Sequence, residues 1–206
     1  IWARNADKSA AAVETLLAHG VRAIAVTCDV ADEASVAAAT ARTVDELGRI
    51  DICVANAGTS GAGAIQDLSL EEWRRVLSIN LDGAFLTVRD CARQMIAQDE
   101  GGAIVVISST SAIFGAPNTP HYATSKTALL GMARSAAVGL ARHRIRVNSV
   151  LPGWTRTEMA EGGYQNDKFR EATTKRTPVR RWASGDEYQS LAAYLCDTSV
   201  DFHTGD

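Results

Sequence analysis

Residues 122 to 126 read YATSK and place a phenol and an ammonium group four positions apart, where the chain is predicted to be helical from about Tyr122 onward. Residues i and i+4 of a helix share one face, so Tyr122 and Lys126 can act in one small site. A free tyrosine has a pKa near ~10, which a neighbouring positive charge lowers. The spacing therefore suggests a tyrosine that exchanges a proton with a substrate and is tuned by a lysine.

Ser109 could be a third member of such a site. Ser109 ends the apolar run GGAIVVISS, and its hydroxyl can donate a hydrogen bond to a substrate oxygen while Tyr122 moves a proton. The Tyr and Lys pattern is short, and a surface tyrosine and lysine on an ordinary helix give the same letters. The rest of the chain has to decide between these interpretations.

Apolar runs rich in strand-forming residues alternate with helical ones, which predicts the elements that position this chemistry. Strands are expected within residues 21–30, 49–58, 101–109 and 144–153, and helices within 33–48, within 69–98 and from Tyr122 onward. Runs such as AIVVIS are apolar on both faces, as in parallel strands covered by helices on both sides. We predict an α/β fold with a doubly wound parallel sheet, a Rossmann fold, as a single domain over residues 1–206.

In such a sheet, ligands bind beyond the carboxyl ends of the strands. Polar or glycine-containing segments follow each apolar run at that point: Asp29, Asn56 to Gly58, Ser108 and Ser109, and Pro152-Gly153. We expect them to converge on one edge of the sheet.

Composition limits the partners. The 206 residues are 46% hydrophobic with a net charge of -3, so there is no basic surface for nucleic acid or an anionic membrane. No stretch reaches the roughly 18 to 20 apolar residues of a membrane span. We expect a cytoplasmic protein with a small-molecule ligand. Its four cysteines and four histidines lack ligand spacing, which predicts buried thiols and no metal site.

Taken together, the order and spacing of these residues resemble the short-chain dehydrogenase/reductase family over residues 1–206. Tyr122 follows Ser109 by thirteen positions, and the family's helix asparagine falls on Asn80 in SINLDGAF. The other matching motifs are Asp29-Val30, the turn Asn56-Ala57-Gly58, and Pro152, Gly153 and Thr157 in the PGxxxT pattern.

The resemblance implies hydride transfer between a nicotinamide cofactor and a secondary alcohol or ketone. Tyr122 would be the acid/base, Lys126 would hold the nicotinamide ribose and tune the phenol, and Ser109 would orient the substrate oxygen. Asn80 would hold a water that extends the proton path. Asparagine is mildly unfavourable inside a helix, so a structural Asn80 bonded to the backbone is the alternative.

The resemblance also implies a set of cofactor contacts. They are Arg4, Asn5, Asp29, Val30, Asn56, Ala57, Gly58, Tyr122, Lys126, Pro152, Gly153, Thr155 and Thr157. An acidic residue at the end of the family's second strand would accept from a ribose hydroxyl, whereas an arginine pairs with a 2'-phosphate. Arg4 occupies this position, which favours NADP, with NAD possible.

Both ends of the chain are interpreted as truncated. The family's Gly-rich phosphate loop would precede Ile1 by roughly 20 residues, and a last strand would follow Asp206. We therefore assign the function to the parent protein, since the pyrophosphate needs that loop.

Two further segments bear on the substrate and on assembly. Residues 154–182 are polar and poorly periodic, which predicts a loop or mobile lid whose Trp154, Met159, Tyr164 and Trp182 line a pocket or anchor the loop. The helix after Tyr122 is rich in alanine and glycine, for core packing or a subunit contact. The resemblance implies a homodimer or homotetramer.

Several alternatives stay open. A sugar or polyol dehydrogenase and a 3-oxoacyl-[acyl-carrier-protein] reductase fit the same motifs, although Glu100 and His143 lie beside Arg144 and Arg146 where carrier-binding reductases use basic residues. An enoyl reductase would space its tyrosine and lysine more widely. A non-catalytic cofactor-sensing or scaffold protein needs no proton donor, so the complete Ser, Tyr, Lys and Asn set argues against it.

Overall fold

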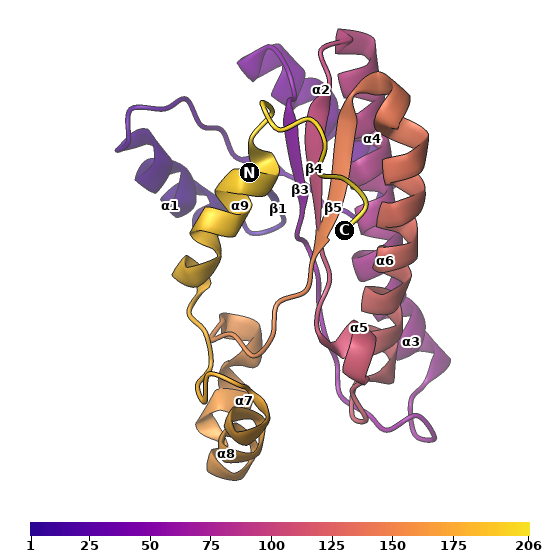
Figure 1. The fold of residues 1–206 in the computed structure, drawn as a ribbon, viewed down its shortest axis with the longest axis vertical. Coiled ribbons are helices and arrows are strands. Elements are labelled where there is room, and N and C mark those ends of the chain that lie inside the picture. Colours follow the sequence, from indigo (N-terminus) through magenta and orange to yellow (C-terminus); the bar gives the residue numbers. More distant parts are fainter.

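The computed structural model describes all residues 1–206 and contains only parallel strand pairs (Figure 1). Strands β1 (Trp2–Ala3) and β2 (Val26–Thr27) form one short pair. Strands β3 (Ile52–Ala55), β4 (Gly102–Ile107) and β5 (Ile145–Val150) form a second sheet in the order β3-β4-β5. The predicted doubly wound parallel fold is confirmed.

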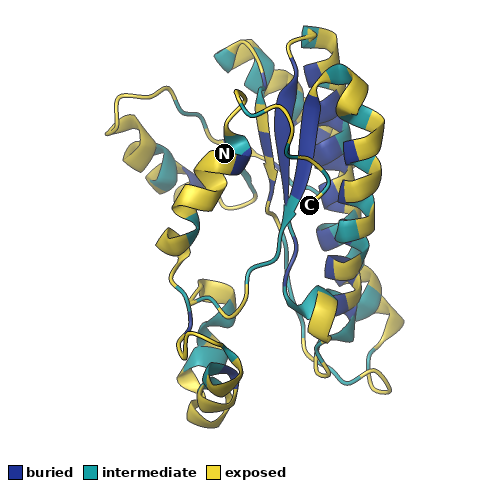
Figure 2. Ribbon diagram, viewed as in Figure 1, coloured by how far each residue is buried: buried dark blue, intermediate teal, exposed yellow.

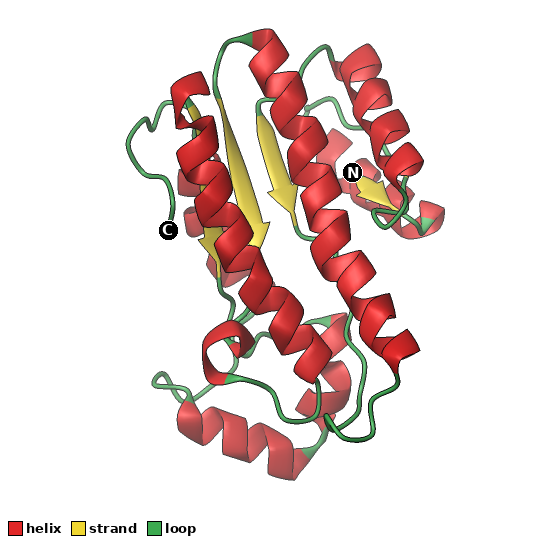
Figure 3. Cartoon of the chain, turned by 90° about the vertical axis from the view of Figure 1, so that its right-hand side faces the viewer, coloured by secondary structure: helices red, strands yellow, loops and turns green.

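Helices lie on both sides of these strands. They are α1 (Ala6–Leu17), α2 (Glu33–Leu47), α3 (Leu70–Leu77), α4 (Gly83–Gln98), α5 (Ser111–Phe114), α6 (Pro120–Leu140), α7 (Glu161–Gln165), α8 (Asp167–Arg176) and α9 (Gln189–Cys196). Three 3-10 turns are η2 (Ala141–His143), η3 (Glu158–Ala160) and η4 (Gly185–Tyr188), and η1 (Ser78–Asp82) is a π-helical turn. Helices α4 and α6 cover one face of the three-stranded sheet (Figure 3), and α9 packs against β4 from the other.

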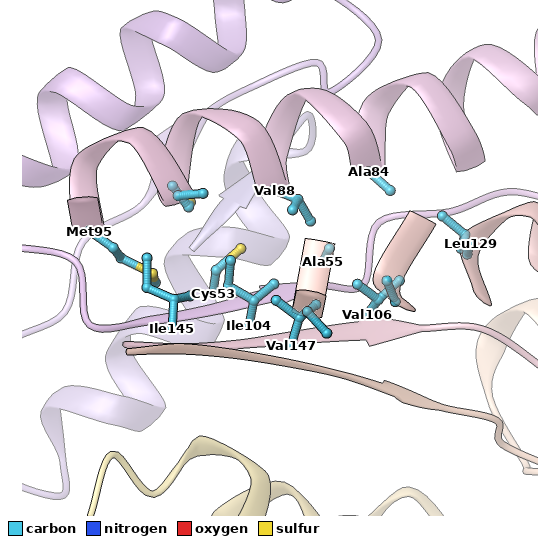
Figure 4. Packing of buried hydrophobic residues seen from close by; sticks show 14 of the residues in the cluster. Cys53, Ala55, Ala84, Val88, Met95, Ile104, Val106, Leu129, Ile145 and Val147 are labelled. Atoms are coloured by element: carbon cyan, nitrogen blue, oxygen red, sulfur yellow. The ribbon is translucent and has the colours of Figure 1, made fainter. Parts of the chain in front are cut away.

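The main core lies between β3 to β5 and the two long helices. Ile104, Val106 and Val147 from the strands meet Met95 of α4 and Leu129 of α6, and each is at most 1% exposed (Figure 4). Burial of a side chain of this size contributes roughly 1.5–3 kcal/mol. The buried sheet interior stands out against the exposed outer helix faces (Figure 2). The thiols of Cys28, Cys53 and Cys91 are buried and that of Cys196 is partly buried; all four are free.

Two predicted elements are shorter or interrupted in the structure. In the predicted strand 21–30, only Val26–Thr27 pairs with a neighbouring strand, because β1 offers just two residues. The single helix predicted for 69–98 is broken into α3 and α4 by η1. The apolar periodicity continues through the break, so the sequence pattern did not show it.

Residues 154–182 were predicted to form a loop or mobile lid, and the loop part of this prediction was wrong, while the lid role stays a prediction. The segment folds into η3, α7 and α8 around an aromatic cluster, in which Trp154 stacks on Trp182 at 4.9 Å between ring centroids and meets Phe169 edge-on. Trp182 is buried and donates its indole N–H to Thr173 Oγ1. These rings lie far apart in sequence, so no short window shows a helical period.

The end of the chain is held by a buried arginine of β5. The Arg146 guanidinium donates to the carbonyls of Leu195 (2.9 Å) and Asp197 (2.7 Å) at the C-terminus of α9, and to that of His203 (3.2 Å). A cation suits a helix C-terminus, whose last carbonyls lack partners within the helix. Residues 204–206 then run along β5, where the Gly205 N–H donates to the Val147 carbonyl.

We predict that Arg146→Met lowers the free energy of unfolding by about 2 kcal/mol, because three carbonyls lose their charged donor and one of them, that of Leu195, is buried, where an unpaired group costs ~1–3 kcal/mol. Urea titration measures the change. Arg134→Met, on the exposed face of α6, is the matched control and should change it by less than about 0.5 kcal/mol. Equal stabilities for the two variants would contradict the role given to Arg146.

Candidate active site

The predicted catalytic side chains meet beyond the carboxyl ends of β3 and β4. Ser109 lies two residues past the end of β4, and Tyr122 and Lys126 lie in the first turns of α6, which begins with Pro120 at its first position. A proline there costs no helix hydrogen bond. The Lys126 Nζ lies 5.6 Å from the centroid of the Tyr122 ring, so the two residues share one face as their spacing predicts.

Lys126 is a buried cation with an incomplete set of partners. Its side chain is 4% exposed, and Nζ donates to the Ile107 carbonyl at 2.8 Å. Burial lowers the pKa of Lys126 to about 8. An ammonium group has three N–H donors, so two remain without a protein acceptor. They lie beside the turn after β3, where a Cβ on Gly58 would be 3.5 Å from Nζ.

Tyr122 is partly buried, and this burial raises the pKa of its phenol, while hydrogen bonding to the Ser109 side chain opposes the shift. The Lys126 ammonium lies over the ring and donates to the Ile107 carbonyl, and the expected lowering of the Tyr122 pKa by Lys126 stays a prediction. Ser109 is itself held in place, since its Oγ accepts from the Ser111 N–H at 3.1 Å.

Asn80 sits in the π-helical turn and is fully buried. Its Oδ1 accepts from the Thr59 N–H at 2.7 Å, and its Nδ2 donates to the Thr59 carbonyl at 2.9 Å and to Ser125 Oγ at 3.0 Å. The Ser125 hydroxyl donates in turn to the Tyr122 carbonyl. The side chain thus makes the backbone contacts of the structural alternative. The water-holding role stays a prediction, since only one lone pair of Oδ1 remains free.

Ser108 was predicted to lie at this edge of the sheet, but the sequence did not show its role or those of Ser125, Thr59 and Thr110 in positioning the site. Ser108 donates its hydroxyl to the Lys126 carbonyl at 2.7 Å, and Thr110 N–H donates to the Pro152 carbonyl at 3.1 Å, which joins the loops after β4 and β5. Ser125 stands inside the YATSK stretch and Ser108 next to Ser109, so both were visible in the motifs. Thr59 carried no signal, because Asn80 contacts its backbone.

The predicted cofactor residues at the ends of β1 and β2 form a separate group. Arg4 Nη1 lies 3.9 Å from Asp29 Oδ2, with the side chains 67% and 46% exposed. Asp29 is therefore an acidic neighbour that the sequence did not place beside Arg4. Asn5 caps α1, since its Oδ1 accepts from the Lys8 N–H. Val30 packs against the backbone of α4, where a Cβ on Gly83 would collide with it.

The turn Asn56-Ala57-Gly58 follows β3 directly, with Asn56 and Ala57 exposed. The Thr155 hydroxyl bonds to the Tyr188 hydroxyl at 2.9 Å and also donates to the Gly153 carbonyl. Thr157 caps η3. No hydrogen bond joins Thr155 or Thr157 to Ser109, Tyr122 or Lys126, so their predicted cofactor contacts remain predictions.

A second cluster adjoins the site and was also missed. His121 precedes Tyr122, is fully buried, and has no hydrogen-bond partner at either ring nitrogen. Its Nε2 lies 3.6 Å from Oε1 of Glu72, whose pKa is lowered to about 2, chiefly by hydrogen bonding to Arg75. An unpaired buried polar group costs ~1–3 kcal/mol. The sequence showed only an isolated histidine.

The structure gathers no group of three or more His, Cys, Asp and Glu side chains in a geometry that could hold a metal ion. None of its helices combines the length and apolarity that a membrane crossing requires.

Comparison with known proteins places this geometry among oxidoreductases. The family model described as enoyl-(acyl carrier protein) reductase matches residues 1–206. L-Rhamnose 1-dehydrogenase (NAD(P)(+)) of Sphingomonas sp. is 33% identical over 204 residues, covering 99% of this chain and 80% of that protein. A short-chain type dehydrogenase/reductase from Mycobacterium marinum superposes with a TM-score of 0.93 at 34% identity, covering 99% of this chain and 80% of that one. A gluconate 5-dehydrogenase from Burkholderia cenocepacia, solved with NADP and tartrate, has a TM-score of 0.94 at 31% identity. The match covers 100% of this chain and 80% of that one.

We predict that Lys126 makes stability rise with pH. Its folded pKa of about 8 lies below the model-peptide value of 10.5, so between these values the unfolded chain binds more protons and the free energy of unfolding increases with pH. The gain from pH 8 to pH 9.5 should be about 1.5 kcal/mol, measured by urea titration relative to Lys126→Met. Lys168→Met, on the exposed side of α8, should retain the wild-type slope. A slope unchanged in Lys126→Met would rule out a buried ammonium.

Proposed function

Because the chain belongs to the short-chain dehydrogenase/reductase family, we propose that it is an NADP-preferring oxidoreductase of secondary alcohols and ketones, with Tyr122 as the acid/base. The observation that carries the proposal is the placement of Tyr122 beside both Ser109 and the buried Lys126 at the end of β4. A binding module needs no proton donor at that point, which disfavours a non-catalytic scaffold.

Tyr122 and Ser109 have different roles in the reaction. In alcohol oxidation, the Tyr122 phenolate takes the proton of the substrate hydroxyl while a hydride leaves the carbon that bears this hydroxyl. Ser109 holds the substrate oxygen by a hydrogen bond. In ketone reduction, the Tyr122 phenol returns the proton to the oxygen. A bound nicotinamide dinucleotide would supply the carbon that takes up or gives the hydride. Burial raises the pKa of Tyr122, which keeps the proton available for reduction at neutral pH.

Hydrogen-bond donors that suit the cofactor lie at two positions, Lys126 and Arg4. The two unused N–H donors of Lys126 suit ribose hydroxyls beside Gly58. The exposed Arg4 guanidinium suits a 2'-phosphate, since its contact with Asp29 is a single one at 3.9 Å. The negative charge of Asp29 repels a 2'-phosphate and so weakens the preference for NADP. The Sphingomonas relative is named for both NAD and NADP, and the gluconate 5-dehydrogenase holds NADP.

A sugar or polyol is the substrate class that has most support. The loops around Ser109 and Tyr122 carry hydroxyl and amide side chains, among them Thr59, Ser60, Thr110 and Asn118. Such groups suit a polyhydroxylated ligand better than an acyl chain, and two of the relatives are named for rhamnose and gluconate. Tyr122 and Lys126 keep the spacing of alcohol and ketone reductases, which disfavours enoyl reduction despite the description of the family model.

We further propose that residues 1–206 are one Rossmann-type domain of a cytoplasmic homodimer or homotetramer. Phe85 of α4 and Val138 of α6 are 49% and 83% exposed, and such apolar side chains on two neighbouring long helices support a subunit contact.

Tyr122→Phe tests the acid/base role in the full-length protein. It keeps the ring and removes the transferable proton, so kcat for reduction of a ketose panel should fall by ~10² to 10⁴-fold with the cofactor Kd unchanged. NADPH absorbance measures turnover. Tyr194→Phe, near the end of α9, is the control and should keep wild-type kcat. Near-normal turnover in Tyr122→Phe would overturn the mechanism.

Arg4→Ser tests cofactor choice. Removal of the cation should weaken NADP binding by roughly tenfold and leave NAD binding within about twofold, because one charge-assisted hydrogen bond is worth ~1.5 kcal/mol or more. Fluorescence titration gives both Kd values, with Arg142→Ser as an exposed control. Equal losses for the two cofactors would show that Arg4 does not read the 2'-phosphate.

A further inference from the structure

His121 is buried in a polar environment that leaves it unpaired. Its side chain is 0% exposed, neither ring nitrogen has a hydrogen-bond partner, and the Glu72 carboxylate of α3 lies 3.6 Å from Nε2. Buried polar groups are nearly always satisfied, so an unsatisfied one calls for a reason. The proposed chemistry uses Tyr122 and Lys126 of the same helix and leaves His121 without a role.

The loop after β3 lies directly against this pair of side chains. A Cβ added at Gly61 would collide with Glu72 Oε1 and would lie 2.7 Å from His121 Nε2. Only glycine lets the loop backbone approach both groups so closely. The contact between His121 and Glu72 therefore fixes where this loop can lie.

Glu72 also connects the loop to α3 through a second charged residue. Arg75 Nε donates to Glu72 Oε2 at 2.6 Å, and Arg75 Nη2 donates to Oε1 at 2.7 Å. The same Nη2 donates to the Ser60 carbonyl at 3.0 Å. A bidentate arginine and carboxylate pair has a defined orientation. Arg75 thus holds Ser60, and the orientation of Arg75 depends on Glu72. Glu72 in turn faces His121.

The loop reaches the proposed catalytic residues on both sides of this contact. Thr59 is bonded twice to Asn80, and the Gly63 N–H donates to the Asn118 carbonyl in the segment just before α6. Residues 59–63 therefore link Asn80 to the segment that precedes Tyr122. A shift of their backbone leaves Tyr122 and Lys126 in place, since both lie in α6 and Lys126 is bonded to β4.

We propose that His121 is a positioning residue that, through an Nε2 contact with Glu72, holds loop 59–63 in the conformation that binds substrate. The proposal rests on the proposed function, because it assigns the loop to the substrate side of the same site. Loss of the contact weakens substrate binding, and the chemical step is retained, since the His121 ring is not hydrogen-bonded to Ser109, Tyr122 or Lys126.

Three substitutions at position 121 separate the contact from simple packing. His121→Gln places an amide N–H near the position of Nε2, His121→Asn places one near Nδ1 and does not reach Glu72, and His121→Leu removes both. KM and kcat are measured for the best ketose of the panel with NADPH, together with hydrogen exchange of the loop amides.

In His121→Leu and His121→Asn, KM should rise by roughly tenfold, kcat should change less than about twofold, and the amides of residues 59–63 should exchange faster. His121→Gln should restore both readouts. Equal behaviour of the Gln and Asn variants, or a KM unchanged in His121→Leu, would overturn the proposal.

Gly61→Ala tests the same contact from the loop side and keeps the core histidine in place. The added methyl group should push the loop off Glu72 and reproduce the rise in KM and in exchange. Gly185→Ala, where a Cβ meets no atom within 4 Å, is the control. If the protein reduces no substrate, the proposed function fails, and loop exchange alone decides the role of His121: unchanged exchange in His121→Leu overturns it.

Discussion

The buried amide of Asn80 is the interaction on which the rest of the site depends. It joins three parts of the chain that are distant in sequence: the loop after β3 through Thr59, the π-helical turn that carries it, and α6 through Ser125. An amide can donate twice and accept twice, which few other side chains of its size can do. The π-helical turn between α3 and α4 sets the position of this amide, as such turns often do at functional sites. The three hydrogen bonds of Asn80 therefore depend on the helix break that positions its side chain.

The electrostatics of the site follow from the burial of Lys126. A buried ammonium is unfavourable unless it is hydrogen-bonded, and the structure provides one carbonyl, that of Ile107. Burial acts in opposite directions on the two groups, since it lowers the pKa of Lys126 and raises that of Tyr122. Both shifts favour neutral forms, although a pKa of about 8 keeps Lys126 mostly charged at pH 7. A ligand that brings acceptors to the free N–H donors of Lys126 would favour its charged form.

The segments beyond the strand ends differ in how they are held. The loop after β3 is held by hydrogen bonds between Asn80 and Thr59 and from Arg75 to the Ser60 carbonyl; Arg75 lies in α3 and Asn80 in η1. Residues 154–182 pack through stacked and edge-on aromatic rings around the buried Trp182, together with hydrogen bonds such as that from the Trp182 indole to Thr173. Polar contacts fix direction, whereas ring packing tolerates small displacements at little cost.

The sequence by itself determined the parallel fold and the pairing of Tyr122 with Lys126. Both follow from local rules: strands buried on two faces are apolar throughout, and residues four apart on a helix share a face. Only the tertiary structure decided the rest. It brought Asp29 to Arg4, broke the helix at Asn80, folded residues 154–182 around Trp182, and placed His121 against Glu72. Each of these joins residues from separate elements, and their geometry depends on how strands and helices stack, which no local pattern of residue types records.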